Sequence, residues 1–398
     1  MKLSGEIALA SGFIFDYSNM INTDTITPAV IETLESKAKD AADALLLIRE
    51  QGMAKAHLSK DGTPEHVLFT KLPFVKNGNP NTPESIAKLK QFGSYLQQEI
   101  DAVVFLGVGG SYLGNKVLFD IFAGSGWNVG CEKRRHGYPR VYFSGNNLDV
   151  DQYSEVVDEV EYLATHRLGK NEQFRVLLVP ISKSGTTLET LAAFSYFYEQ
   201  CQKSSLLQME VAVVTDLDED ISPLYNLAKE NVWQCFDIKE GIGGRFCIFS
   251  DPGLITAAAI GMDIDAFLCG ARDMENACQS ASLGENPALL NAVLKYAAAE
   301  KGVDIEVFMP YAAKMKSVGE WYVQLLAESL GKRKDREGNV VYYGRTPVSA
   351  VGSTDMHAQT QQHQDGKKDK VIQFVEILER EQQIVLNNPF TPISSLKK

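Results

Sequence analysis

The sequence predicts an α/β protein with two parallel-sheet sandwich subdomains, of which the second is incomplete. Two observations predict this fold class. From about residue 100, short apolar segments alternate with helical ones, as in parallel sheets that helices cover on both faces. Glycine- or hydroxyl-rich turns follow several of the apolar segments directly, as at strand-to-helix junctions in such sheets. A chain of 398 residues is long enough for two such units.

The N-terminal part, residues 1–75, is predicted to be a helical arm. Its helix covers residues 27–51, with Thr27 as the N-cap and Pro28 in the first turn. A connector rich in glycine, asparagine and proline follows at residues 74–85. Such a composition favours a break between structural units, so we place a boundary there.

The first sheet unit is expected at residues 76–240, and a stretch of connecting loop and helices at residues 241–300. A long helix is predicted at residues 186–202. Nearly continuous apolar runs in this unit indicate strands buried on both faces. The predicted strands are residues 102–108, 140–146, 175–182, 210–216 and 233–238.

The second sheet unit is expected at residues 301–398. A strand at residues 304–310 is followed by a helix at about residues 314–331, and two more strands are predicted at residues 339–345 and 370–377. With about three strands this sheet is shorter than the first, which is why we expect it to be incomplete.

Composition and charge exclude several classes of partner. The net charge is −12 and lysine and arginine form no stripe, which argues against nucleic acid as a main partner. No run of 18 apolar residues exists, and Glu6 and Gly12 interrupt the apolar N-terminus, so we expect neither a membrane span nor a signal peptide. The six cysteines show no metal-binding spacing, so we expect reduced core thiols in a cytoplasmic protein.

The segment GVGGSYLG, residues 107–114, is predicted to bind a phosphate that does not belong to a nucleotide. A dinucleotide fingerprint would need glycine where the chain has Tyr112, and a nucleotide P-loop would need lysine where it has Asn115. Gly109 and Gly110 still let the backbone approach an anion, and Ser111 opens a helix whose first N–H groups favour negative charge.

A second loop, SKSGTTLET at residues 182–190, places hydroxyl groups around Gly185 at the start of a helix. Hydroxyl and backbone N–H groups suit a phosphate dianion. The alternative is a helix cap rich in serine and threonine, with a capping-box glutamate. Two such loops in one sheet favour the phosphate site.

A third loop and one helix supply charged groups. The loop EGIGGRF, residues 240–246, sets Arg245 beside three glycines; a tight turn with a surface arginine is the alternative. On the helix of the second unit, Gln324 and Glu328 are four residues apart and share a face. The apolar residues of this helix form an inward-facing stripe, and Glu328 lies at its edge. This position predicts a partly desolvated carboxylate suited to act as a general base. A boundary glutamate paired with Lys332 is the alternative.

Two histidines lie in a polar, glutamine-rich segment that we expect to be a loop. Histidine titrates near neutral pH, so either His357 or His363 could donate or accept a proton. Two solvated surface histidines are the alternative.

Five of these segments occur in the order, and at roughly the spacing, seen in the phosphoglucose isomerase family, and the sequence resembles its bacterial branch. One such motif is weak, but five in one order are very specific. The resemblance runs from about residue 60 to about residue 380. The segments are GVGGSYLG, SKSGTTLET, EGIGGRF, QLLAESLGK and TDMHAQ.

The resemblance implies two sugar-isomerase (SIS) subdomains and a reversible isomerisation of glucose 6-phosphate and fructose 6-phosphate, in glycolysis and gluconeogenesis, without cofactor or metal. It implies that Glu328 moves a proton between C2 and C1 through a cis-enediol, while Arg245 stabilises the enediolate and Gln324 orients the substrate. It implies that His357 assists ring opening from the neighbouring subunit of a homodimer. The residues implied to hold the sugar phosphate are Gly110, Ser111, Ser182, Lys183, Ser184 and Thr187.

The sequence departs from the family in two places. Cys247 stands where serine or threonine is usual, which is a mild change. The family's C-terminal motif F-D-Q-x-G-V-E-x-x-K, whose lysine helps in ring opening, is absent, and Lys397 and Lys398 do not replace it. We therefore expect a truncated product or a shortened homologue with impaired activity. A phosphosugar-binding SIS module or regulator is the alternative function, although it would not need a base beside Arg245.

Overall fold

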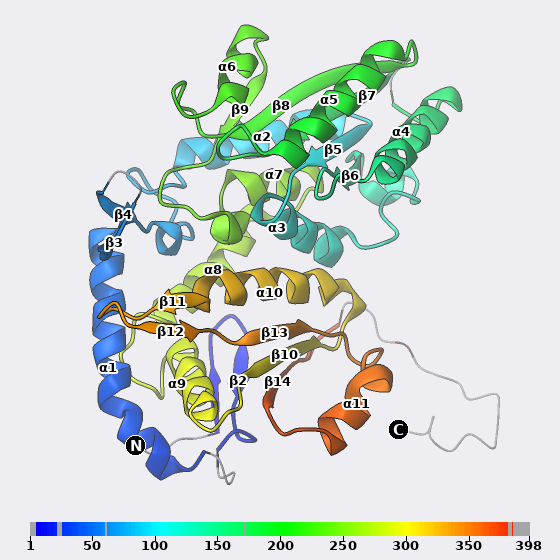
Figure 1. The fold of residues 1–398 in the computed structure, drawn as a ribbon. Helices are drawn as coiled ribbons and strands as arrows, with labels where there is room; N and C mark the ends of the chain where they lie inside the picture. Colours follow the sequence, from blue (N-terminus) through cyan, green and yellow to red (C-terminus); the bar gives the residue numbers. More distant parts are fainter. Residues whose placement is uncertain (1–4, 22–25, 60–61, 171, 381–383, 385–398) are drawn as a thin grey trace, which may run out of the picture.

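A five-stranded, all-parallel sheet forms the centre of the first half of the chain (Figure 1). The structure is a computed structural model that describes residues 5–21, 26–59, 62–170, 172–380 and 384. All five predicted strands are confirmed within a few residues at each end. In spatial order they are β6 (Arg140–Ser144), β5 (Ala102–Leu106), β7 (Phe174–Pro180), β8 (Leu207–Thr215) and β9 (Gln234–Asp237).

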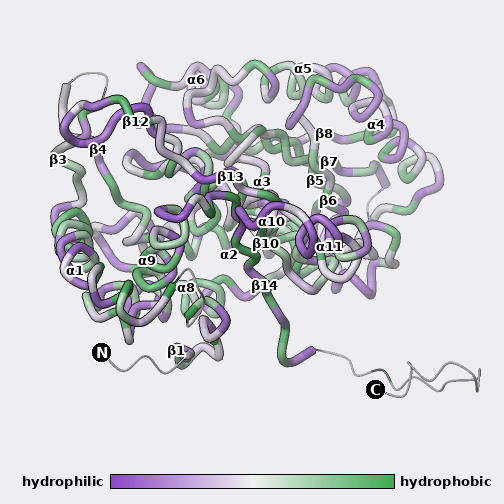
Figure 2. The backbone as a smooth tube through the Cα atoms, turned by 60° about the horizontal axis from the view of Figure 1, so that its bottom comes forward, coloured by the Kyte–Doolittle hydropathy of each residue, from purple (hydrophilic) through white to green (hydrophobic). Residues whose placement is uncertain are grey.

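Helices cover both faces of this sheet because its strands are apolar on both sides (Figure 2). Val103 and Phe105 of β5 pack into one core, and Val104 and Leu106 pack into the other. One face is covered by α2 (Pro83–Glu99), α3 (Gly110–Leu118) and α7 (Asp251–Ala259), and the other by α4 (Val150–Thr165), α5 (Leu188–Lys203) and α6 (Pro223–Glu230). The π-turn η2 (Phe119–Ala123) and the 3₁₀ turn η3 (Glu132–Arg135) follow α3.

The strand order places a switch point between β5 and β7. Numbered along the chain within this sheet, the order is 2-1-3-4-5, and the connection from β5 runs to one edge while the connection from β7 runs to the other. In open sheets of this kind, ligands bind in the crevice beyond the carboxyl ends of the two strands at the switch point. The first two predicted phosphate loops follow β5 and β7, so both lie at this crevice.

The second sheet has three parallel strands, but one of them differs from the prediction. The predicted strand at residues 339–345 is wrong as a member of this sheet, because most of it pairs in an exposed antiparallel hairpin. Its place is taken by the next segment along the chain. The sheet contains β13 (Thr346–Ser349), β10 (Ile305–Pro310) and β14 (Lys370–Val375), and the hairpin contains β11 (Lys332–Lys334) and β12 (Val340–Tyr343).

The predicted long helix of the second half is confirmed as α10 (Lys316–Leu330), preceded by the 3₁₀ turn η5 (Ala313–Met315). It lies between the two halves, packed on α3 on one side and on β13 and β10 on the other (Figure 1). The α3 side of α10 therefore contacts the first half although the helix belongs to the second half.

The N-terminal helix is also confirmed, as α1, and Thr27 caps it by accepting a hydrogen bond from the N–H of Val30 at 3.4 Å. It packs along α9, and Ile31 shares a core with Leu290 and Val371, so the arm covers the second half. The remaining elements are α1 (Pro28–Gln51), α8 (Ile264–Ala277), α9 (Pro287–Ala299), α11 (Met356–Asp365), η1 (Phe69–Lys71), and the hairpins β1 (Glu6–Ala8) with β2 (Ile14–Asp16) and β3 (Met53–Leu58) with β4 (Pro64–His66). The division into domains at residues 75, 240 and 300 stays a prediction.

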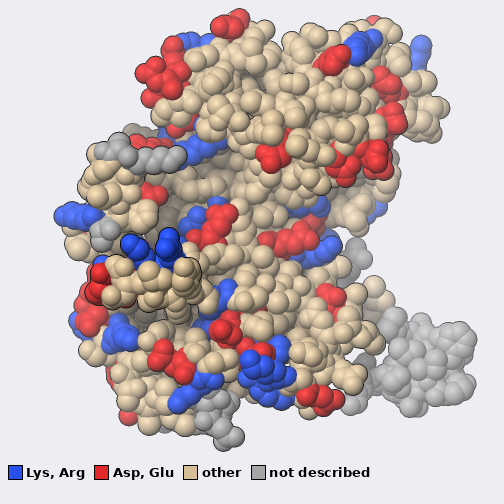
Figure 3. Space-filling model, in the orientation of Figure 1, with Lys and Arg blue, Asp and Glu red and all other residues tan. Residues whose placement is uncertain are grey.

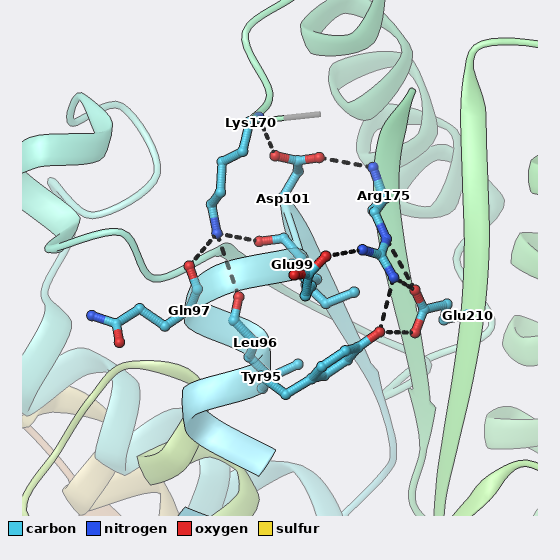
Figure 4. A network of polar contacts seen from close by, with 9 residues as sticks. Tyr95, Leu96, Gln97, Glu99, Asp101, Lys170, Arg175 and Glu210 are labelled. Carbon is cyan, nitrogen blue, oxygen red and sulfur yellow. Dashed lines mark hydrogen bonds and ion pairs between the residues drawn. The ribbon is translucent and has the colours of Figure 1, made fainter. Parts of the chain in front are cut away.

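A polar network braces the end of the first sheet that lies opposite the crevice (Figure 4). Arg175, at the start of β7, contacts the carboxylates of Glu99 and Glu210. Asp101 accepts hydrogen bonds from the backbone N–H groups of Lys170 and Arg175. These groups join α2 to the beginnings of β5, β7 and β8, so we assign them to the fold and not to the candidate site.

The structure bears on the expectations about membrane-spanning helices and about the cysteines. No helix among the described residues is both long and apolar enough to cross a bilayer. All six cysteines are free thiols, but the expectation that they lie in the core is wrong for Cys131 and Cys269, which are exposed. Figure 3 shows that acidic and basic side chains are interspersed on the face it draws.

Candidate active site

The first glycine-rich loop touches the third loop, which carries Arg245. Gly109, with φ of +57°, occupies the N-cap of α3, and Gly110 begins the helix. A Cβ added at Gly110 would lie 2.1 Å from the carbonyl carbon of Gly244, so only glycine allows this backbone approach. Cys247 adds a contact from its thiol to the carbonyl oxygen of Gly110 at 3.4 Å.

The second loop keeps its hydroxyl groups together instead of capping α5. The hydroxyls of Ser182 and Thr187 lie 2.8 Å apart, and those of Ser184 and Thr186 also lie 2.8 Å apart. Thr187 occupies the N-cap position, yet its side chain makes no cap hydrogen bond. Gly185 turns the chain with φ of +63°. The helix-cap alternative is therefore wrong for Thr187, because no N–H group in the first turn of α5 donates a hydrogen bond to its side chain.

Lys183 links the second loop to the third. Its Nζ donates to the carbonyl oxygen of Ile242 at 3.4 Å. Three loops separated by up to about 130 residues along the chain thus meet at one end of the first sheet. The predicted phosphate-binding residues of the first and second loops follow the neighbouring strands β5 and β7, whose ends are in register at Leu106 and Pro180.

Arg245 and Glu328 face each other across the junction of the two halves. Arg245 lies in the 3₁₀ turn η4 (Gly244–Phe249), and its Nη1 lies 3.3 Å from Oε2 of Glu328. Its Nε donates to the hydroxyl of Ser329 at 3.0 Å. Gln324 donates from Nε2 to the other carboxylate oxygen of Glu328 at 3.0 Å. The predicted sharing of one helix face by Gln324 and Glu328 is therefore confirmed.

Glu328 is predicted to be partly desolvated, and its side chain is 50% exposed. This edge of α10 therefore faces solvent and not the core. The alternative, a pair with Lys332, is wrong, since the Lys332 ammonium donates to the main-chain carbonyl oxygens of Glu328 and Ser329. What distinguishes this carboxylate is its two donors, a guanidinium and an amide, and not its desolvation.

Gln324 connects this charged group to the first phosphate loop. A Cβ added at Gly109 would lie 3.2 Å from Nε2 of Gln324, so the amide lies directly against the glycine turn. Oε1 of Gln324 is buried and has no hydrogen-bond partner within the described part of the chain. An amide with one committed donor and one unused acceptor is suited to orient a hydroxyl group of a bound sugar.

The histidine segment is not the predicted loop, since His357 and His363 lie on the short helix α11. His357 is exposed, and α11 lies beyond the opposite end of α10 from Glu328 (Figure 1). Burial and the nearby Lys370 lower the pKa of His363 below its usual value. Within one chain the structure therefore does not bring either histidine to Arg245 and Glu328.

The sequence analysis missed several groups that hold Arg245. The indole N–H of Trp321 donates to the carbonyl oxygen of Arg245 at 2.9 Å, and the Arg245 guanidinium lies over the ring of Phe246 at 4.7 Å. Phe246 in turn stacks on Phe69 with ring centroids 4.1 Å apart. Trp321 and Ser329 are visible in the sequence as members of the helix stripe, but the stripe does not say which segment they contact.

The site combines a carboxylate, a guanidinium and an amide with two hydroxyl- and glycine-rich loops. A carboxylate beside a fixed cation can remove a proton next to a carbonyl group while the cation stabilises the oxyanion that forms. The loops can hold a phosphate at a distance from the reacting carbons. No group of three or more potential ligands placed to hold a metal ion occurs among the residues described.

Comparison with known proteins identifies the family. A family model described as phosphoglucose isomerase matches residues 84–391. The chain is 33% identical to the glucose-6-phosphate isomerase of Carboxydothermus hydrogenoformans, covering 83% of this chain and 67% of that protein. It is 33% identical to the glucose-6-phosphate isomerase of Methanocaldococcus jannaschii, covering 73% of this chain and 63% of that protein.

A solved structure shows the same fold. The glucose-6-phosphate isomerase of Chlamydia trachomatis matches with a TM-score of 0.76 at 23% identity, over 96% of this chain and 72% of that one. The chain spans about 57% to 67% of the length of its curated relatives. The matched residues include all the loops and helices that build the site. By the match to the family and by its site, this chain belongs to the phosphoglucose isomerase family.

Proposed function

We propose that this chain catalyses the reversible isomerisation of glucose 6-phosphate and fructose 6-phosphate by proton transfer through a cis-enediol, a step of glycolysis and gluconeogenesis. One observation carries the proposal: the Glu328 carboxylate lies 3.3 Å from the Arg245 guanidinium, and Gln324 joins this pair to the glycine loop. The names of the curated relatives supply the substrate class.

In this proposal Glu328 takes the proton from C2 of the open-chain aldose and returns it to C1. Arg245 stabilises the negative charge that develops on the enediolate oxygen, and Gln324 orients the sugar hydroxyls. A fixed cation at a developing oxyanion lowers the barrier because it needs no reorganisation during the reaction. The phosphate would be held by the first N–H groups of α3 and α5 with the hydroxyls around them. The proposed phosphate-binding residues are Gly110, Ser111, Ser182, Lys183, Ser184 and Thr187.

We further propose a cytoplasmic homodimer in which His357 assists ring opening at the site of the other subunit. The separation of α11 from Glu328 within one chain supports a shared site. Dimers of Glu328→Gln and dimers of His357→Ala should each be inactive on the cyclic sugar. Dissociating and mixing them should restore part of the activity, because one of the two sites in each hybrid then carries both native residues. Absence of any restoration in verified hybrids would contradict the shared site.

The hydroxyl loop gives a prediction on affinity. The double variant Ser184→Ala and Thr187→Ala should weaken binding of phosphorylated sugars by about 1–3 kcal/mol, because a charged acceptor loses two donors. Isothermal calorimetry with fructose 6-phosphate measures the effect. The variant Ser204→Ala, at the far end of α5, serves as the control and should bind normally. An equal loss with unphosphorylated sugars would mean that the double variant disturbs the fold and not the anchor.

A coupled isomerase assay on the 398-residue chain, in both directions, tests the proposed function. Turnover of both sugar phosphates is the expected result. Saturable binding of fructose 6-phosphate without any turnover or proton exchange would instead favour the phosphosugar-binding module or regulator, and would reject the enzyme.

A further inference from the structure

One hydrogen bond ties the base-bearing helix to the backbone of the catalytic arginine. The indole Nε1 of Trp321 donates to the carbonyl oxygen of Arg245 at 2.9 Å. Trp321 and Glu328 are seven residues apart on α10, which is about two helical turns, so they lie on the same face. Ser329, which accepts from Nε of Arg245 at 3.0 Å, is the next residue.

The backbone and the guanidinium of Arg245 are thus both held by residues of α10. Trp321 holds its backbone, and Ser329 and Glu328 hold its guanidinium two turns later. At the guanidinium, the contact with Glu328 is exposed, since Glu328 is half exposed and its oxygen lies 3.3 Å from Nη1, whereas the hydrogen bond from Nε to Ser329 is part-buried. Exposed ion pairs contribute little to geometry on their own. The part-buried hydrogen bonds that join Arg245 to Trp321 and to Ser329 are therefore firmer restraints than the ion pair with Glu328.

Trp321 itself is fixed on both sides. Its ring packs, together with Val318, against the core of the first half. The adjacent residue, Tyr322, donates to the buried carboxylate of Glu306 and stacks on Phe308 with centroids 4.6 Å apart, which anchors α10 to the second sheet. Neighbouring residues of α10 therefore contact opposite halves of the molecule, and Trp321 is the one that faces the first half.

From this arrangement we infer that Trp321 is a positioning residue: its indole N–H sets the distance between the Arg245 guanidinium and the Glu328 carboxylate. The inference rests on the proposed function, because that distance matters only if a proton is moved and an oxyanion forms between the two groups. Misplacement of a catalytic group by about 1 Å can cost about 100-fold in rate. Trp321 acts in this account through its hydrogen bond to Arg245.

Trp321→Phe tests the inference, because it keeps the aromatic ring but removes the N–H donor. The chain offers a matched control in Trp127, whose Nε1 donates to the carbonyl oxygen of Pro139, also at 2.9 Å and away from the site. Both variants should lose a similar, small amount of thermal stability. Only Trp321→Phe should lower kcat, by about 10- to 100-fold, with KM for fructose 6-phosphate within about twofold of the wild type.

A crystal structure of Trp321→Phe supplies a readout that does not depend on turnover. We expect the Arg245 turn to shift and its contact with Glu328 to be lost, while the loops at Ser111 and Ser184 stay in place. An unchanged contact, or a kcat no lower than that of Trp127→Phe, would overturn the positioning role. If the wild-type chain does not isomerise at all, the proposed function fails, and the crystal structure alone decides whether Trp321 holds Arg245.

Discussion

Replacing Glu328 by glutamine should abolish proton transfer while leaving phosphosugar binding nearly intact. The amide has the size of the carboxylate and can still accept the hydrogen bond from Gln324, but it has no basicity. Loss of a general base costs about 10²–10⁴-fold in rate, and more when no other group substitutes for it. The affinity for fructose 6-phosphate should change little, because the proposed phosphate anchor lies on the loops after β5 and β7. Steady-state kinetics and calorimetry measure the two effects separately.

A matched control lies on the same helix. Glu320 is two turns before Glu328 and pairs with Lys316 on the surface at 3.7 Å. Glu320→Gln removes a charge from α10 without touching the site, so its kcat should stay close to the wild-type value. Near-wild-type exchange of the C2 proton with solvent in Glu328→Gln would remove Glu328 from the role of base.

Arg245→Gln should have the second largest effect. Its charge lies against the Glu328 carboxylate, where the proposed enediolate forms. Removing a preorganised donor to a developing oxyanion costs about 10²–10³-fold in kcat. The effect on KM should be smaller, because the ground-state sugar carries no charge at that oxygen.

The control for this variant is Arg333→Gln, in the exposed strand β11 that follows α10. It removes an arginine near the site whose side chain bonds to neither Glu328 nor Ser329 within the described part of the chain, and it should leave kcat unchanged. Equal losses in kcat for Arg245→Gln and Arg333→Gln would indicate a general effect of net charge and would contradict the assigned role of Arg245.

The first sheet could be predicted from the sequence because its signals are local. Each strand, such as that at residues 102–108, is a short apolar run that begins or ends at a recognisable turn. The glycines at 109 and 110 and the hydroxyl groups at 182–187 mark loops that must lie at the ends of strands. The spacing of Gln324 and Glu328 likewise puts both side chains on one helix face, whatever the helix packs against.

The sequence-based predictions are wrong where a residue's surroundings are supplied by a segment that is distant along the chain. The apolar residues of β12 look like a core strand, but β13 takes the place beside β10 and leaves β12 exposed in a hairpin. The stripe on α10 predicts partial desolvation of Glu328, whereas its side chain is 50% exposed. Trp321 and Arg245 are 76 residues apart, and no local pattern predicts the hydrogen bond that joins them.

The most direct test of the account is to run the isomerisation in deuterium oxide. Wild-type chain, with fructose 6-phosphate as substrate, should give glucose 6-phosphate that carries deuterium at C2 in part of the product, because a proton held on Glu328 exchanges with solvent before it returns to carbon. Nuclear magnetic resonance of the product measures the label, and Glu328→Gln should form neither product nor label. Product without any deuterium at C2, or equal labelling by Glu328→Gln, would contradict proton transfer by Glu328.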